Sequence, residues 1–215
     1  MIPFGEYLPD LPPLENPGAT VANNVIPRTP ASYGPLAGLA NITTALTARC
    51  QGARSFRDTA GNAYTFAGDA TRLYRVPGAD SSTWSNVSIA VGYTISADET
   101  WELALYGSRV IATDFADAIQ SYVMGTSTLF ANLAAAAPRA RHIAIIREFV
   151  MVGNTWDSTD GNRPNRVWWC ASDDPTNWPT IGSAAAASVQ SDRQDIPTGG
   201  WAQAIIVAVG GADGL

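Results

Sequence analysis

Apolar residues in this chain fall into short runs, and three times one run is followed, after a short turn, by a second. The three pairs occupy residues 63–67 with 73–76, 101–106 with 109–113, and 142–146 with 149–152. Short apolar runs separated by turn residues predict antiparallel β-hairpins. A recurring hairpin is typical of antiparallel blades stacked around an axis, as in a β-propeller. We therefore predict an all-β fold, a partial or complete β-propeller of antiparallel blades.

The remaining apolar runs are weaker, and they continue this pattern over residues 42–215. Further strands are predicted at residues 47–56, interrupted at Gly52, and at 84–91, 119–124, 166–170 and 201–209. Aligning residues 101–106 with 141–146 gives an approximate repeat of about 40 residues, within the range of propeller blades. The pattern amounts to about three blades and the start of another. Either other chains complete the propeller, or the sequence is part of a longer protein.

Four segments interrupt the strand pattern. Residues 132–137 are the best helical candidate, because Leu and Ala favour helix, and Pro138 ends the segment. The other three are predicted as a polar loop at 154–165, a cluster of turns at 173–179 and an Ala-rich loop at 181–189.

Residues 1–41 are predicted to form an extended N-terminal arm that docks on another surface. Prolines recur too often for a helix, and each removes a backbone donor from a strand; they stand at positions 3, 9, 12, 13, 17, 27, 30 and 35. Large apolar residues lie among them, and a pre-set backbone lowers the entropy cost of docking. We expect five interface residues in this arm: Phe4, Tyr7, Leu8, Ile26 and Tyr33.

Composition changes this picture mainly at the surface. Hydrophobic residues make up 46% of the 215 residues, which is enough for a core, but charged residues are only 15%. Such a surface suits burial against other subunits, although Ser, Thr and Asn also provide polar cover. The net charge of −6 argues against a protein that grips nucleic acid, since phosphate contacts need clustered basic side chains.

The two cysteines and the N-terminus bear on cellular location. Cys50 and Cys170 have no neighbouring Cys or His at metal-ligand spacing, so no zinc site is expected. Two buried free thiols, as in a reducing compartment, are favoured over one long-range disulfide. We expect no signal peptide and no membrane span, because no basic and apolar leader is present and no apolar run approaches roughly 18 residues.

Candidate catalytic and metal-binding residues are few, and each has a structural interpretation that we favour. His142 is the only histidine, and a lone histidine is usually structural. Residues 157–162 alternate acidic and amide side chains as calcium ligands do, but a hairpin turn explains them as well. The pairs Asp114 with Asp117 and Asp173 with Asp174 are candidate glycosidase carboxylates, or turn caps. We therefore expect no catalytic residue, no metal site and no cofactor.

Seven tryptophans offer a second kind of chemistry. They stand at positions 84, 101, 156, 168, 169, 178 and 201. Their rings are either a platform for sugars or packing between twisted sheets, and we favour packing.

An ordered series of motifs runs through most of the chain. It comprises residues 8–13 (LPDLPP), 23–29 (NNVIPRT), 32–38 (SYGPLAG), 49–53 (RCQGA), 65–74 (TFAGDATRLY) and 165–178 (NRVWWCASDDPTNW). In order and spacing this series resembles tail nozzle or hub proteins of short-tailed, podovirus-like phages and related prophages. Members of that family usually continue past the position of Leu215.

The resemblance implies a structural role in the virion tail. Nozzle proteins of this family form a sixfold ring below the portal and adaptor, assembled in the host bacterial cytoplasm. The ring extends the channel through which double-stranded DNA leaves the capsid, without binding it specifically. Expected partners are further copies of the chain, the tail adaptor or head–tail connector, and fibre or plug proteins. Two alternatives stay open: a tail-associated propeller lectin or glycan-degrading enzyme, and a monomeric cytosolic propeller scaffold.

Overall fold

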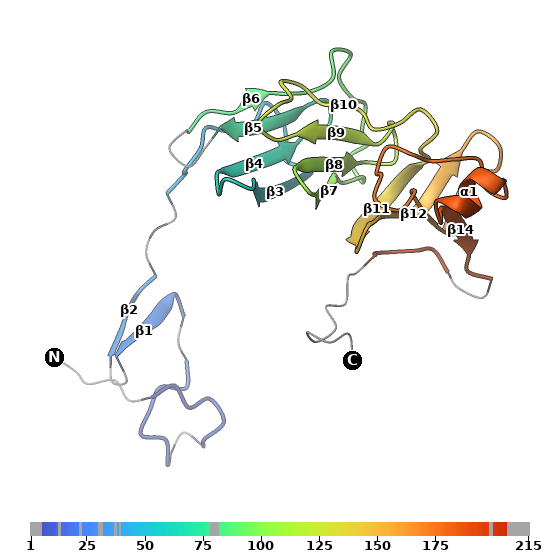
Figure 1. Cartoon of the computed structure of the whole chain (residues 1–215). Helices are drawn as coiled ribbons and strands as arrows, with labels where there is room; N and C mark the ends of the chain where they lie inside the picture. The colour runs from blue at the N-terminus through green and yellow to red at the C-terminus, as the bar shows by residue number, and fades with distance from the viewer. Residues whose placement is uncertain are drawn as a thin grey trace. The chain divides into compact units, whose positions relative to one another are not determined.

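The computed structural model describes residues 6–12, 14–21, 23–29, 32–36, 38, 40–77, 82–197 and 200–205. The chain divides into two compact units, residues 1–42 and 43–215. The fold is all-β, with four antiparallel sheets, and the described residues contain one short helix, α1 (Ala184–Ser188) (Figure 1). No described helix is long and apolar enough to cross a membrane.

The N-terminal unit contains a hairpin of β1 (Val25–Thr29) and β2 (Ser32–Pro35). Upstream of it, Tyr7 and Ala19 form an isolated parallel bridge. The sequence predicted an extended arm without strands, because proline lacks a backbone donor. A two-stranded hairpin tolerates proline, since each strand has one edge that needs no partner.

The second unit consists of three four-stranded sheets, and in each the strands follow one another in chain order. The first sheet contains β3 (Gly52–Arg57), β4 (Ala63–Gly68), β5 (Leu73–Pro77) and β6 (Ser85–Asn86). The second contains β7 (Glu102–Tyr106), β8 (Arg109–Thr113), β9 (Gln120–Val123) and β10 (Ala131–Asn132). The third contains β11 (Arg139–Ile146), β12 (Phe149–Asp157), β13 (Gly161–Trp169) and β14 (Asp192–Asp195).

The three predicted hairpins are confirmed, as β4–β5, β7–β8 and β11–β12. Strands at 119–124 and 166–170 are confirmed in β9 and β13. Residues 173–176 form turns with one bridge, at Asp174, and 177–179 have no regular structure. Two predicted strands are shorter than expected, because β3 begins only at Gly52 and β6 covers two residues. Residues 201–205 form no strand, and 206–209 lie outside the described residues.

The helix predicted at 132–137 is wrong. Asn132 belongs to β10, and the Leu133 N–H donates to the Ile119 carbonyl at 2.8 Å, so this backbone extends the second sheet. The helix forms instead at α1, where a loop was expected. The Ser183 hydroxyl caps it by accepting from the Ala186 N–H. The alanines of this segment favour helix, and Ser183 adds the hydrogen bond that the Ala186 N–H lacks in the first turn.

The polar loop predicted at 154–165 is also wrong. Strands β12 and β13 run through this segment and meet at a tight turn. The Asp157 carboxylate builds that turn by accepting from the Thr159 and Asp160 N–H groups, each at 2.9 Å. Polarity was misleading here, because the carboxylates of Asp157 and Asp160 pair with Arg166 within the sheet.

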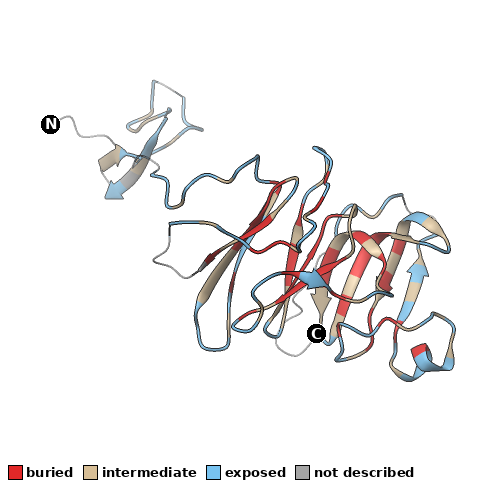
Figure 2. Ribbon diagram, turned by 90° about the horizontal axis from the view of Figure 1, so that it is seen from above, coloured by how far each residue is buried: buried red, intermediate tan, exposed pale blue. Residues whose placement is uncertain are grey.

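Two apolar clusters hold the three sheets together. The first cluster joins the first and second sheets through residues such as Phe66, Leu103 and Tyr122. The other joins the second and third sheets through residues such as Ile111, Ile143 and Val152. Buried positions accordingly concentrate on the strands of these sheets (Figure 2).

The second sheet is buried on both faces. Neighbouring residues along β7 and β8, such as Leu103 with Ala104 and Val110 with Ile111, belong to opposite clusters. A strand that is buried on both sides carries a near-continuous apolar run.

The first strands of the three sheets lie next to one another, β3 against β7 and β7 against β11. The Arg54 guanidinium donates to the Leu103 carbonyl at 2.8 Å across the first of these contacts. Across the second, the Glu102 carboxylate contacts His142 Nδ1 at 2.8 Å and accepts from the Ile143 N–H at 2.9 Å. Polar contacts therefore join the inner edges of the sheets, in addition to the apolar clusters.

Candidate functional site

The predicted arm interface lies in the N-terminal unit, and four of its five residues fall in the described part of the chain. Phe4 lies outside it. Tyr7 is 50% exposed, and the Leu8 N–H donates to the Ala19 carbonyl at 2.9 Å. Ile26 and Tyr33 are half-buried in β1 and β2.

The described residues of this unit include no buried side chain. Seven of its large apolar side chains are exposed: Tyr7, Leu11, Leu14, Val21, Val25, Leu36 and Ile42. A unit of about 40 residues needs a core, a metal or a partner to be stable. The described residues of this unit therefore expose apolar side chains and form no core of their own.

Of the two predicted carboxylate pairs, Asp114 and Asp174 cap turns, whereas Asp117 and Asp173 accept hydrogen bonds from other segments of the chain. Asp114 accepts from the Asp117 N–H at 3.0 Å, and Asp117 accepts from the Thr94 N–H at 3.2 Å. Asp174 accepts from Thr176, while Asp173 accepts from the Tyr106 hydroxyl. Burial, together with the charge of Asp117, raises the pKa of Asp114 to about 7.

The lone histidine links two sheets. His142 Nδ1 contacts the carboxylate of Glu102, which also accepts from the next backbone N–H, so this carboxylate ties β7 to β11. The contact agrees with the structural role favoured from the sequence.

The calcium-like segment 157–162 is a hairpin turn whose carboxylates face arginines. Arg166 is 5% exposed and pairs with Asp160 at 2.7 Å and Asp195 at 2.5 Å. Arg193 also pairs with Asp160, at 2.8 Å. Hydrogen bonds from Arg166 hold the pKa of Asp160 and of Asp195 below the ordinary value. Cationic nitrogens occupy the oxygens that a calcium ion needs.

The cysteines differ in environment. Both are free; Cys170 is buried but Cys50 is exposed, so the expectation of two buried thiols is wrong for Cys50. Cys50 precedes β3, where no neighbouring strand covers it. In the part of the chain that the structure describes, no cluster of three His, Cys, Asp or Glu side chains is placed to hold a metal ion.

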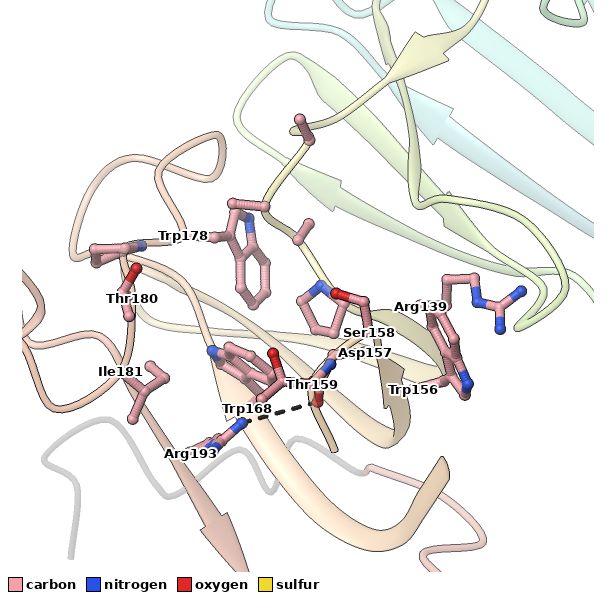
Figure 3. A pocket seen from close by; sticks show the side chains of 15 residues that line it. Arg139, Trp156, Asp157, Ser158, Thr159, Trp168, Trp178, Thr180, Ile181 and Arg193 are labelled. Atoms are coloured by element: carbon pink, nitrogen blue, oxygen red, sulfur yellow. Dashed lines mark hydrogen bonds and ion pairs between the residues drawn. The ribbon is translucent and has the colours of Figure 1, made fainter. Parts of the chain in front are cut away.

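A cavity of about 700 Å³ opens at one end of the third sheet (Figure 3). We call it the tryptophan cavity, because Trp156, Trp168 and Trp178 line it. It is bounded by the chain ahead of β11, the β12–β13 turn, the turn cluster that follows β13 and Arg193 of β14. Its volume is that of a small-molecule site.

Two arginines hold the cavity rings in place. The Arg139 guanidinium carbon lies 3.8 Å from the centre of the Trp156 ring, and that of Arg193 lies 5.1 Å from the centre of the Trp168 ring. Arg139 also donates to the Ala116 carbonyl at 2.8 Å. Each indole is therefore fixed by a cation that has a partner of its own.

The tryptophans divide between the two interpretations from the sequence. Trp101, Trp168 and Trp178 are 4%, 7% and 3% exposed and belong to the apolar clusters, as the packing interpretation requires. Trp156 is half-buried and lines the cavity together with parts of the Trp168 and Trp178 rings, which sequence spacing did not show. The sequence analysis also did not identify Arg139 and Arg193 as cavity residues. Their only signal was that they stand before and after Trp168 and Trp169 in the chain, and the strand β14 that carries Arg193 was not predicted.

No family model and no curated protein matches the chain.

Proposed function

We propose that this chain is a non-enzymatic structural component of a phage tail nozzle or hub. In this proposal it forms a sixfold ring below the portal and adaptor and extends the DNA ejection channel. Residues 1–41 act as the docking arm. The observation that carries the proposal is the N-terminal unit, which exposes seven large apolar side chains and, among its described residues, buries none.

The arrangement of the sheets supports blades of a partial propeller. Each sheet is a four-stranded antiparallel meander, and the first strands of successive sheets are adjacent. Both features are those of neighbouring propeller blades. The second sheet is covered on both faces by the other two, as a blade is inside a propeller.

The charge of the chain supports a channel through which DNA slides. The net charge is −6. Arg166, Arg193 and Arg141 each pair with a carboxylate. An acidic wall repels phosphate, so DNA passes through without being held.

The test is the assembly state of the full chain, alone and mixed with tail adaptor rings, measured by native mass spectrometry and particle imaging. The proposal expects sixfold rings, or sixfold decoration of the adaptor. A chain that stays monomeric and ignores the adaptor contradicts it. Two variants in the arm, Leu14→Ser and Leu36→Ser, are expected to weaken binding to the adaptor ring. Their control is Val91→Ser, at an exposed position of the second unit, which should leave adaptor binding unchanged.

One observation favours a second candidate, a tail-associated propeller lectin. Three tryptophans line one cavity, and their rings offer it flat apolar surface. The glycan-degrading version needs two carboxylates facing one bond. Neither predicted pair lines the cavity, and among its lining residues the only carboxylate is Asp157. The geometry therefore favours binding over hydrolysis.

A further inference from the structure

We infer that the tryptophan cavity binds a pyranose ring, the unit of a surface polysaccharide. This inference goes beyond ring assembly and does not depend on it. It rests on the shape of the cavity, the chemistry of its walls and one buried donor without a partner.

The walls combine flat apolar rings with polar rim groups. Trp156 is half-buried, whereas Trp168 and Trp178 are 7% and 3% exposed, pack in the apolar cluster between the second and third sheets, and line the cavity with the rest of their surface. The hydroxyls of Ser158, Thr159 and Thr180 stand at exposed positions around them. A pyranose has the matching surface, because its C–H face packs on an indole while its hydroxyls point outward to polar groups.

The site is formed before any ligand arrives. Arg139 is stacked on Trp156, and Arg193 is stacked on Trp168 and tied to Asp160 at 2.8 Å. Rings that are already held lose little conformational freedom when a ligand packs on them. The two stacked arginines therefore act as positioning residues for the indoles.

A buried donor in the cavity wall is unsatisfied. The indole N–H of Trp168 is buried and has no hydrogen-bond partner among the described residues. Figure 3 shows this nitrogen on the side of the ring that faces Thr180 and Ile181, both of which line the cavity. An unpaired buried donor is unfavourable, and a sugar hydroxyl at this position accepts from it.

The charges of the lining residues favour neutral and acidic sugars over amino sugars with a free ammonium group. Arg139 and Arg193 are cationic, and Asp157 is the one anionic group that lines the cavity. An acidic sugar adds a carboxylate that these guanidinium groups attract. Neutral, N-acetylated and acidic sugars all contain the pyranose ring, and a panel of three probes distinguishes among them.

The experiment is saturation-transfer NMR on the full chain with methyl glucopyranoside, methyl N-acetylglucosaminide and glucuronate as probes. At least one probe is expected to receive saturation. Thr180→Trp fills the cavity from its exposed rim without removing a core residue, and should reduce that signal at least tenfold. Trp156→Ala removes one ring and should also reduce it. Their matched controls are Thr128→Trp, an exposed threonine beside the second sheet, and Trp84→Phe, outside the cavity; both should keep the signal within twofold.

Two results overturn the inference: no signal with any probe on the unchanged chain, or a signal that Thr180→Trp leaves intact. Melting temperatures of the variants are measured alongside, and Thr180→Trp keeps the test valid even if Trp156→Ala unfolds. Assembly with the adaptor is scored on the same samples. If the chain assembles into sixfold rings but binds no sugar, only this inference is rejected. If it binds sugar but forms no sixfold assembly, only the nozzle proposal is rejected.

Discussion

Two buried aspartates show how environment decides the behaviour of one residue type. Asp69 is fully buried, and burial by itself raises the pKa of its carboxyl. Hydrogen bonds from Thr71, Thr47, Tyr74 and Arg72 outweigh that effect, so the pKa falls below the ordinary value. Asp69 therefore stays ionised and fixes the turn between β4 and β5.

Asp114 has the opposite balance. It is 1% exposed, one of its carboxylate oxygens has no partner among the described residues, and its pKa rises to about 7. The folded chain thus holds this proton more tightly than the unfolded chain, whose ordinary value is 3.8. The contribution of Asp114 to the free energy of unfolding is fully present below the unfolded pKa of 3.8. It falls as the pH rises from 3.8 toward about 7 and does not change further above that pH.

We expect Asp114→Asn to stabilise the protein at pH 8 by about 1–3 kcal/mol, because it removes an unpaired buried charge. At pH 5 the gain should be smaller, because the stability of the unchanged protein has fallen over only part of the interval between 3.8 and about 7. Thermal unfolding at both pH values measures this. Asp98→Asn, at an exposed position, is the control and should show no such pH dependence. Equal effects of Asp114→Asn at both pH values would contradict the assignment.

Arg166 gives a second prediction at this scale. Arg166→Met leaves Asp157, Asp160 and Asp195 without their shared cation and should cost about 2–3 kcal/mol, a fall of roughly 5 °C in melting temperature. Pairing lowers the pKa of Asp160 and of Asp195 in the folded chain. Their contribution to the free energy of unfolding is therefore present above the unfolded pKa and is lost as the pH falls through the folded pKa. The difference from the unchanged chain should therefore shrink in acid.

Arg163→Met is the matched control, an exposed arginine on the same strand, and should change stability little. If both arginine variants melt alike, the buried ion-pair cluster is not the source of stability.

At the scale of elements, Trp101 joins the first sheet to the second. Its backbone N–H donates to the Gln51 carbonyl at 2.8 Å, and its indole N–H donates to the Asp69 carbonyl at 3.0 Å. The ring lies so close to Gly68 that a Cβ there would come within 2.2 Å of it. Glycine at the end of β4 is therefore a packing requirement of the interface between sheets.

We expect Gly68→Ala to destabilise the protein by about 2–3 kcal/mol, because two hydrogen bonds fix Trp101 and it has no room to move. Chemical denaturation measures the loss. Gly200→Ala is the control, since a Cβ at Gly200 meets nothing within 4 Å. An unchanged midpoint for Gly68→Ala would mean that the two sheets are less tightly joined than this geometry implies.

At the scale of the whole molecule, the two units differ in how they are stabilised. Every buried hydrophobic residue that the structure describes lies in the second unit, from Phe56 onward. The first unit has a hairpin and a bridge but, within its described residues, no buried side chain. The second unit therefore has a core of its own, whereas the described residues of the first form none.

Deleting residues 1–42 should therefore leave the melting temperature of the second unit within a few degrees of the full chain. The same deletion should abolish assembly with the tail adaptor, because the proposed arm is gone. Circular dichroism melting and particle imaging of the same sample measure both outcomes. A shortened chain that still decorates the adaptor removes the arm from the proposal, and one that unfolds shows that residues 1–42 contribute to the core.

The sequence by itself determined the antiparallel hairpins, because apolar runs and turn residues are local signals that survive in any context. It also placed Asp114 and Asp174 correctly as turn caps. The wrong helix at 132–137 and the missed strands through 154–165 share one cause. Leu133 bonds to Ile119, and Thr155 pairs with Ala140 and Arg163, and this pairing with neighbouring strands overrides local propensity.

Only the tertiary structure decided which side chains meet. Trp156, Trp168 and Trp178 come from a strand end, a strand interior and a loop, and the third sheet brings them to one cavity. Arg193 reaches Trp168 through β14, which pairs with β13 across a long connection. Such contacts depend on register and twist over many residues, so no local pattern encodes them.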